Sequence, residues 1–132
     1  MLLALAMGIH QEVRFKASPE KIYAALTDGR EFGQFTGAPA EVTAVEGQSF
    51  SLFGGQITGR NIELVPDKSL VQAWRVGAWP SGVYSIVRIT LEREGDQTKL
   101  TLDHTGFPDG AAEHLESGWH KMYWEPLRAY LG

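Results

Sequence analysis

The sequence predicts an α+β domain in which a curved antiparallel sheet wraps around one long C-terminal helix. Apolar and polar residues alternate near the start of the chain, over residues 9–16. The same alternation recurs between short turns over residues 40–105, which is typical of an antiparallel meander. From residue 111 onward the apolar residues recur at helical spacing instead. This order of strand and helix patterns favours helices on one face of an antiparallel sheet.

One domain is expected over residues 9–132. The chain has 132 residues and 43% of them are hydrophobic, which is enough for a single core. The opening seven residues are apolar but lack the basic start of a secretion signal. We therefore interpret residues 1–8 as a leader or disordered segment, or as the tail of a linker from a longer parent chain.

The first predicted strand is followed by two short helices. The strand buries one face, formed by Ile9, Gln11, Val13 and Phe15. Ser18 then offers an N-cap hydroxyl, Pro19 occupies the first helical position, and Glu20 lies near the positive end of the helix dipole. Asp28-Gly29 should end this helix, and a second helical turn should carry Phe32 and Phe35.

Six further strands are predicted in the meander. They are placed near residues 40–45, 49–53, 57–65, 69–76, 83–93 and 97–105. Gly54-Gly55 is expected to form a two-residue hairpin connection, because glycine tolerates positive φ at both positions. The apolar side chains change parity between Ile57 and Ile62, so we expect a bulge near Gly59 at which the sheet curls.

A long amphipathic helix is predicted over residues 111–130. Its apolar residues are Leu115, Trp119, Met122, Tyr123, Leu127 and Tyr130. Pro126 removes one backbone donor from this helix, so a kink or looser turn is expected between Met122 and Pro126. The sheet should grip the helix and leave an apolar cavity as the default ligand site. The expected lining residues are Trp74, Val76, Leu102, Trp119, Met122 and Tyr123, although for Trp74 and Trp119 a core-filling role is favoured over ligand contact and both roles are compatible.

Composition excludes several classes of function. The 16 acidic and 12 basic residues give a net charge of -4, which disfavours nucleic acid as a partner. The chain has no cysteine, so it holds no disulfide or thiolate zinc site, and we expect a cytoplasmic protein. No segment approaches the roughly 20 apolar residues of a membrane span, so a membrane is not an expected partner.

The ionisable residues indicate neither catalysis nor a metal site. His114 and His120 lie six residues apart on the predicted helix, which is not the spacing of a helical zinc site, so both are expected at the surface. Asp103 and His104 are neighbours on a strand and should point to opposite faces. No nucleophile elbow, phosphate loop or dinucleotide fingerprint occurs, so no catalytic residue, metal or cofactor is assigned.

One loop is a candidate for contact with a partner protein. Trp79 and Pro80 fall between two predicted strands, where a large aromatic side chain has little structural reason to be. Trp79 could instead close the end of the cavity.

Short motifs along the chain match one known family in the same order. They are Ser18-Pro19-Glu20, Phe35-Thr36 with Ala38-Pro39-Ala40, Phe50-Ser51-Leu52-Phe53-Gly54-Gly55, Glu63-Leu64-Val65-Pro66, Trp74-Arg75, Trp79-Pro80-Ser81-Gly82, and Gly118-Trp119 with Tyr123. In this combination the chain resembles the C-terminal domain of activators of the heat-shock protein 90 ATPase, within the helix-grip, START-like superfamily. The resemblance covers nearly all of residues 13–130.

The resemblance implies a co-chaperone that binds heat-shock protein 90 and stimulates its ATPase activity. The sequence does not include the large N-terminal domain of the two-domain family members, so we expect either a fragment of a longer protein or a free-standing relative. Two alternatives remain. One is a free-standing module that binds a small lipophilic ligand between sheet and helix, and the other is a cyclase-like or hydratase-like enzyme, as some superfamily relatives are.

Overall fold

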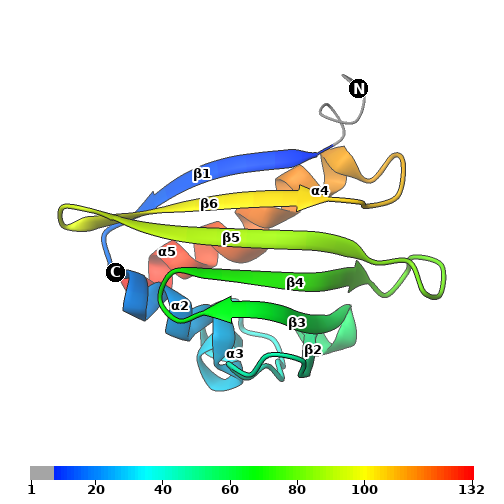
Figure 1. The fold of residues 1–132 in the computed structure, drawn as a ribbon, viewed down its shortest axis with the longest axis horizontal. Coiled ribbons are helices and arrows are strands. Elements are labelled where there is room, and N and C mark those ends of the chain that lie inside the picture. The colour runs from blue at the N-terminus through cyan, green and yellow to red at the C-terminus, as the bar shows by residue number, and fades with distance from the viewer. Residues whose placement is uncertain (1–7) are drawn as a thin grey trace.

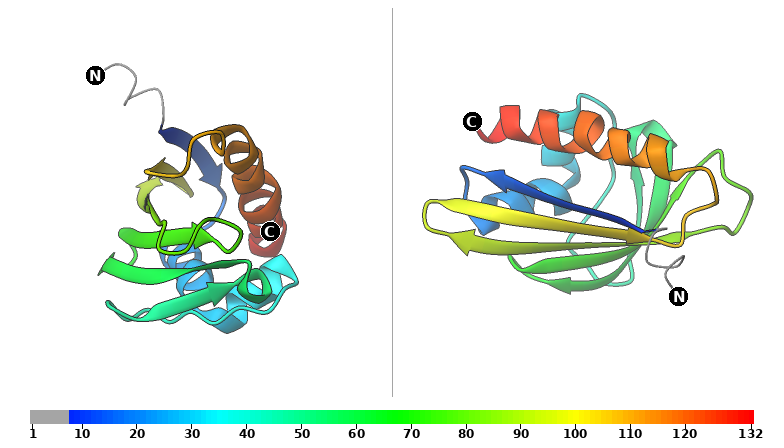
Figure 2. Two further views of the ribbon diagram at one scale, coloured as in Figure 1. Left: turned by 90° about the vertical axis from the view of Figure 1, so that its right-hand side faces the viewer. Right: turned by 90° about the horizontal axis from the view of Figure 1, so that it is seen from above.

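Six antiparallel strands form one curved sheet, and the helices lie on one of its faces (Figures 1 and 2). The computed structural model describes residues 8–132. The expected leader or disordered segment at residues 1–8 falls outside the described residues except for Gly8. The strands are β1 (Ile9–Phe15), β2 (Ser49–Leu52), β3 (Ile57–Val65), β4 (Ser69–Val76), β5 (Ser85–Glu94) and β6 (Gln97–Thr105), in the spatial order β1-β6-β5-β4-β3-β2.

Two short helices follow β1, as the sequence predicts. Helix α2 (Pro19–Thr27) begins at Ser18, whose hydroxyl accepts a hydrogen bond from the Lys21 amide, and helix α3 spans Gly29–Thr36. Both helices contact α5 (Glu125–Leu131) and lie against the same face of the sheet (Figure 2). Their buried phenylalanines, Phe32 and Phe35, join the main core.

The segment at residues 40–45 is not a strand, which corrects the prediction. Only an isolated bridge pairs Glu41 with Ser51 there. The other polar backbone groups find partners outside a ladder: the Val42 carbonyl accepts from the Gly29 amide, and the Asn61 side-chain amide donates to the Thr43 carbonyl at 2.8 Å. The alternating pattern therefore belongs to an irregular segment that connects α3 to the edge of the sheet.

Two local predictions in β2 and β3 are also wrong. Residues 53–56 form a tight 3₁₀ turn, η1 (Phe53–Gly55), in which Phe53, Gly54 and Gly55 all have positive φ, rather than a two-residue hairpin at Gly54-Gly55. The bulge lies between Asn61 and Glu63 instead of near Gly59, and it leaves Ile62 exposed. Glycine at position 59 has a separate cause, because a Cβ there would lie 1.9 Å from the Ala73 carbonyl oxygen.

The C-terminal helix runs across the concave face of the sheet, which confirms the predicted helix-grip architecture (Figure 2). It consists of α4 (Ala112–Gly118), a π-helical segment η2 (Trp119–Trp124) and α5. The strand residues buried in the core between sheet and helix include Phe50, Leu52, Trp74, Val87, Ile89, Leu91, Leu100 and Leu102. Among residues 8–132, none of the helices has the length and apolar character needed to cross a bilayer.

Candidate functional site

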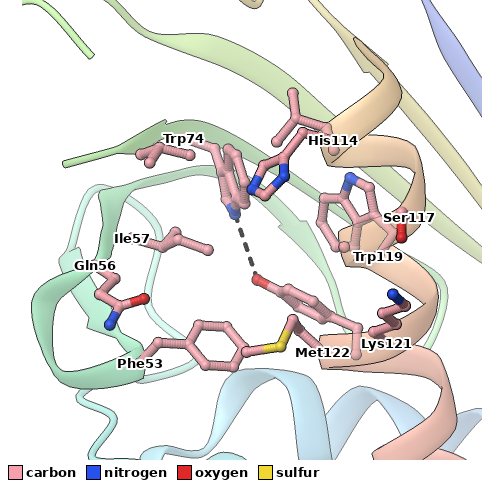
Figure 3. Close-up of a pocket in the computed structure, with 13 residues that line it drawn as sticks. Phe53, Gln56, Ile57, Trp74, His114, Ser117, Trp119, Lys121 and Met122 are labelled. Carbon is pink, nitrogen blue, oxygen red and sulfur yellow. Dashed lines mark hydrogen bonds between the residues drawn. The ribbon is translucent and has the colours of Figure 1, made fainter. Parts of the chain in front are cut away.

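A pocket of about 410 Å³ opens between the C-terminal helix and the end of the sheet formed by η1, β3 and β4 (Figure 3). Phe53, Ile57 and Trp74 line it from the sheet side, and Trp119 and Met122 line it from the helix side. The remaining lining residues are Gln56, Val76, His114, Leu115, Ser117, Gly118, Lys121 and Tyr123.

The structure brings five of the six expected cavity residues to this pocket. Trp74, Val76, Trp119, Met122 and Tyr123 line it, whereas Leu102 is completely buried in the core beneath it. Reasoning from the sequence missed Phe53, Gln56 and Ile57, because the two-residue hairpin predicted at Gly54-Gly55 would have placed them differently.

The π-helical segment decides which helix residues face the sheet. Pro126 has no amide hydrogen to donate, and the Glu125 amide instead bonds to the His120 carbonyl in the wider π pattern. The additional residue per turn rotates the helix face, so Trp119, Tyr123 and Trp124 are all buried. Met122 was expected to face the sheet, but its side chain is 48% exposed at the edge of the pocket.

The tryptophans on the helix and on β4 form a rigid stack. The ring centroids of Trp74 and Trp119 lie 5.5 Å apart, and those of Trp119 and Trp124 lie 5.4 Å apart. Each indole N–H has an acceptor: Trp124 donates to the Gln11 side-chain carbonyl at 2.7 Å, and Trp74 donates to the Tyr123 hydroxyl at 3.4 Å, the bond drawn in Figure 3. These bonds hold the two indole rings in fixed orientations.

A buried histidine holds the third indole. Trp119 donates its N–H to His104 Nδ1 at 3.1 Å, so the histidine proton lies on Nε2 and is donated to Ser85 Oγ at 2.8 Å. Ser85 in turn donates to the Trp74 carbonyl at 2.8 Å. Asp103 points away and bonds to His10 instead, as the alternation along the strand predicts.

This network does not activate Ser85 as a nucleophile. A base beside a serine must accept the hydroxyl proton, but here His104 Nε2 donates to the serine because its other ring nitrogen already accepts from Trp119. Burial also lowers the pKa of His104 to about 4, so the ring is neutral at physiological pH. The arrangement is a structural relay that orients Trp119.

The two histidines of the C-terminal helix lie at its surface. His114 and His120 are exposed on the helix, as expected from their spacing. Within residues 8–132, no cluster of three histidine or acidic side chains comes together that could hold a metal ion.

The loop with Trp79 and Pro80 is fixed by Arg75. The Arg75 guanidinium donates to the carbonyls of Trp79, Pro80 and Val83, at 2.6, 3.1 and 3.1 Å. The Trp79 ring is partly buried and meets the Trp74 ring edge to face at 6.0 Å, whereas Pro80 is exposed. Trp79 therefore rests on the core beside the pocket without lining it.

A family profile described as "Activator of Hsp90 ATPase homolog 1-like protein" matches residues 16–132. The chain is 31% identical over 118 residues to the activator of 90 kDa heat shock protein ATPase homolog 1 of Homo sapiens, a match that covers 89% of this chain and 35% of the relative. It is 35% identical over 108 residues to the corresponding homolog of Dictyostelium discoideum, covering 81% of this chain and 28% of that protein. The chain thus spans about a third of the length of these relatives.

Among solved structures, the fold is similar to that of an HSP90 activator from Plasmodium falciparum. The two share 27% sequence identity and a TM-score of 0.90, and the match covers 96% of each chain.

Proposed function

The chain belongs to the family of activator of Hsp90 ATPase homolog 1-like proteins, and from this membership we propose that it is a co-chaperone that binds an Hsp90-type chaperone and stimulates its ATPase activity. The observation that carries the proposal is the similarity to the HSP90 activator from Plasmodium falciparum, which extends over 96% of both chains. That activator shares the whole domain seen here. The proposed place of action is the compartment of the chaperone, which we take to be the cytoplasm.

A protein without catalytic groups of its own can raise the turnover of another enzyme by binding. If it binds the ATPase-competent conformation of the chaperone more tightly than the resting one, the population shifts toward the active state. A tenfold difference in affinity for the two conformations changes their free-energy difference by about 1.4 kcal/mol. The neutral His104 and the orientation of its proton support a binding role, because they leave Ser85 without a base.

The loop at residues 77–84 is the proposed contact surface. Arg75 bonds to three of its carbonyls, so little conformational entropy is lost when a partner binds there. The exposed ring of Tyr84, the last residue of the loop, lies under the Arg75 guanidinium at 5.8 Å and adds a second aromatic side chain to this surface. Aromatic and arginine side chains are the residues that are enriched in the hot spots of protein interfaces.

The direct test measures ATP hydrolysis by the purified Hsp90-type chaperone of the same organism. We expect its turnover to rise with added chain and to saturate, and we expect a complex in sedimentation velocity. ATP hydrolysis that persists when an inhibitor occupies the chaperone's ATP site is subtracted as background. Unchanged hydrolysis together with absence of a complex would overturn the proposed function.

A further inference from the structure

We propose that the chaperone contact continues from the loop at residues 77–84 onto the convex face of the sheet, and that the partner surface it fits is acidic. This inference rests on the function proposed above and adds the chemistry of the partner. The helices lie against the concave face, so within residues 8–132 no helix covers the convex face (Figure 2). A second protein can therefore approach this side of the sheet.

Strand pairing brings three arginines together on the convex face. Arg60 on β3 is paired with Ala73 on β4, and Ala73 is paired with Ile86 on β5. Arg75 follows Ala73 by two residues, so its side chain points to the same side of the sheet. Arg88 follows Ile86 by two residues and does the same. These three arginines, called the arginine patch below, flank Ala73 and Ile86.

The positive charge of the arginine patch is not neutralised by neighbouring acids. None of its guanidinium groups forms an ion pair with a carboxylate of residues 8–132. Asp103 is paired with Arg88 across β5 and β6, but its carboxylate accepts a hydrogen bond from the His10 ring at 2.6 Å. Glu63 on β3 is separated from Arg88 by Val71 on β4. The patch is therefore a locally basic surface on a chain whose net charge is -4.

The local charge, and not the net charge, decides which partner surface fits here. At physiological salt, charges farther apart than about 8 Å are largely screened from one another. A protein in contact with the patch therefore interacts with the arginines more strongly than with acids on other elements. Guanidinium groups bind carboxylates through two parallel N–H···O bonds, so a surface rich in aspartate and glutamate is the complementary one.

One guanidinium of the patch is held in position before a partner binds. Arg75 donates from Nε and Nη2 to the loop carbonyls, while its Nη1 group has no partner within residues 8–132. The Nη1 hydrogens are thus available to a carboxylate of the partner. Because the side chain is already ordered, little of its conformational entropy is lost on binding.

Exposed apolar side chains give the patch a hydrophobic centre. Ile86 is 41% exposed, and Tyr84, two residues earlier in the chain, is 50% exposed. Ala73 lies beside Ile86 and has only a methyl side chain, so an apolar side chain of the partner can pack against Ile86 above it. The partner surface that fits best therefore carries an apolar side chain among its carboxylates.

The first test measures how the affinity for the chaperone depends on salt. The full chain is labelled at its N-terminal amine and titrated with the purified chaperone, and fluorescence anisotropy reports binding. We expect the dissociation constant to rise about tenfold or more between about 50 and about 300 mM salt, because screening weakens contacts between charges. An affinity that does not change with salt would contradict an acidic partner surface.

Charge reversal identifies the arginines that carry the contact. Arg88→Glu and Arg60→Glu should each weaken binding about tenfold, and the remaining affinity should depend less on salt. A folding defect would not reduce the salt dependence, and thermal unfolding checks the fold of Arg60→Glu, because Arg60 also donates to the Gly47 carbonyl.

Lys16→Glu is the matched control for charge reversal. Lys16 is exposed and directly follows β1, whose last residue lies at the end of the sheet formed by the β5–β6 hairpin. This position is remote from the arginine patch, so the affinity should stay within about twofold of that of the original chain.

Ile86→Ser tests the hydrophobic centre of the patch. We expect about fivefold weaker binding with an unchanged salt dependence, because an apolar contact is lost and no charge changes. Thr90→Ser shortens a side chain on the same face of β5, farther from the patch, and should have no effect.

The outcomes separate this inference from the function on which it rests. Absence of binding between the original chain and the chaperone would overturn the proposed function and the inference with it. Binding that Arg60→Glu and Arg88→Glu both leave unchanged would overturn the inference alone, because the chain would then contact the chaperone through another surface.

Discussion

At the scale of single residues, His104 makes the stability of the fold depend on pH. It is completely buried between Ser85 and Trp119, and burial lowers its pKa to about 4, against about 6.5 in the unfolded chain. Between these two pH values the unfolded state therefore binds more protons than the folded state. The stability that neutral His104 contributes to the fold is complete above pH 6.5 and is lost as the pH falls toward 4.

We expect the free energy of unfolding to fall by about 2 kcal/mol between pH 7.5 and pH 5 on account of His104 alone. Urea unfolding at a series of pH values measures this change. The His104→Gln variant cannot take up the proton and should lose most of the pH dependence in this range. Equal pH dependence in both proteins would contradict the assignment. His10 is exposed, and its pKa is raised mainly because its ring donates a hydrogen bond to the Asp103 carboxylate, so its contribution to stability is lost as the pH rises through that raised pKa.

A second residue, Gly59, is required by the close approach of two strands. A Cβ at this position would lie 1.9 Å from the Ala73 carbonyl oxygen and 2.5 Å from the Phe50 ring. We predict that Gly59→Ala lowers the free energy of unfolding by about 3 kcal/mol or more, because backbone must move to relieve the overlap. Thermal or urea unfolding measures this loss. Unchanged stability would contradict the prediction, because it would mean that β3 and β4 can move apart at this point without cost.

At the scale of an element, the C-terminal helix shows what the sequence could and could not predict. The apolar spacing and Pro126 predict both the helix and an irregular turn before the proline, and the π-helical segment η2 confirms that turn. The type of irregularity was not predictable, because a proline can be accommodated by a kink, a bend or a wider turn. For that reason Met122 was placed inside, while the buried Trp124 was overlooked.

The same helix permits a stabilising substitution at Gly118. Glycine is flexible in the unfolded chain, and its helical backbone and open surroundings accept a methyl group here. We predict that Gly118→Ala raises the free energy of unfolding by about 0.5–1 kcal/mol. Differential scanning calorimetry would show this as a higher melting temperature. A lower melting temperature would mean that the space beside Gly118 is not free for a methyl group.

At the scale of the whole molecule, the alternation of apolar residues was sufficient to predict the sheet and the helix it grips. It was not sufficient for residues 40–45, where carbonyls bond to Gly29 and to the Asn61 side chain, partners that are remote in sequence. A cavity between sheet and helix was predicted from the architecture, and Trp74 and Trp119 are among the residues that line the pocket there. Its lower wall at Phe53 depends on a turn with three successive positive φ angles, which no periodicity reveals.

The proposed chaperone contact is also a property of the assembled molecule. Replacing Trp79 with alanine and Pro80 with serine should reduce the stimulation of the chaperone's ATPase by about tenfold, if the loop supplies a hot spot. The control is Val45→Ala, which alters a side chain that is 49% exposed in a different loop. Circular dichroism monitors folding, since Trp79 also touches Trp74. Full stimulation by the double variant would exclude this loop as the contact.

The Gln11 side chain links the two ends of the domain, and this has a consequence for biosynthesis. It accepts the Trp124 indole hydrogen and donates to the Glu116 carbonyl at 3.1 Å, while β1 pairs along its length with β6. Within this domain, β1 therefore finds these partners only after β6 and the C-terminal helix have been synthesised. The nascent chain cannot bury Gln11 until the helix has left the exit tunnel, so we expect this domain to fold after translation of its own sequence is complete.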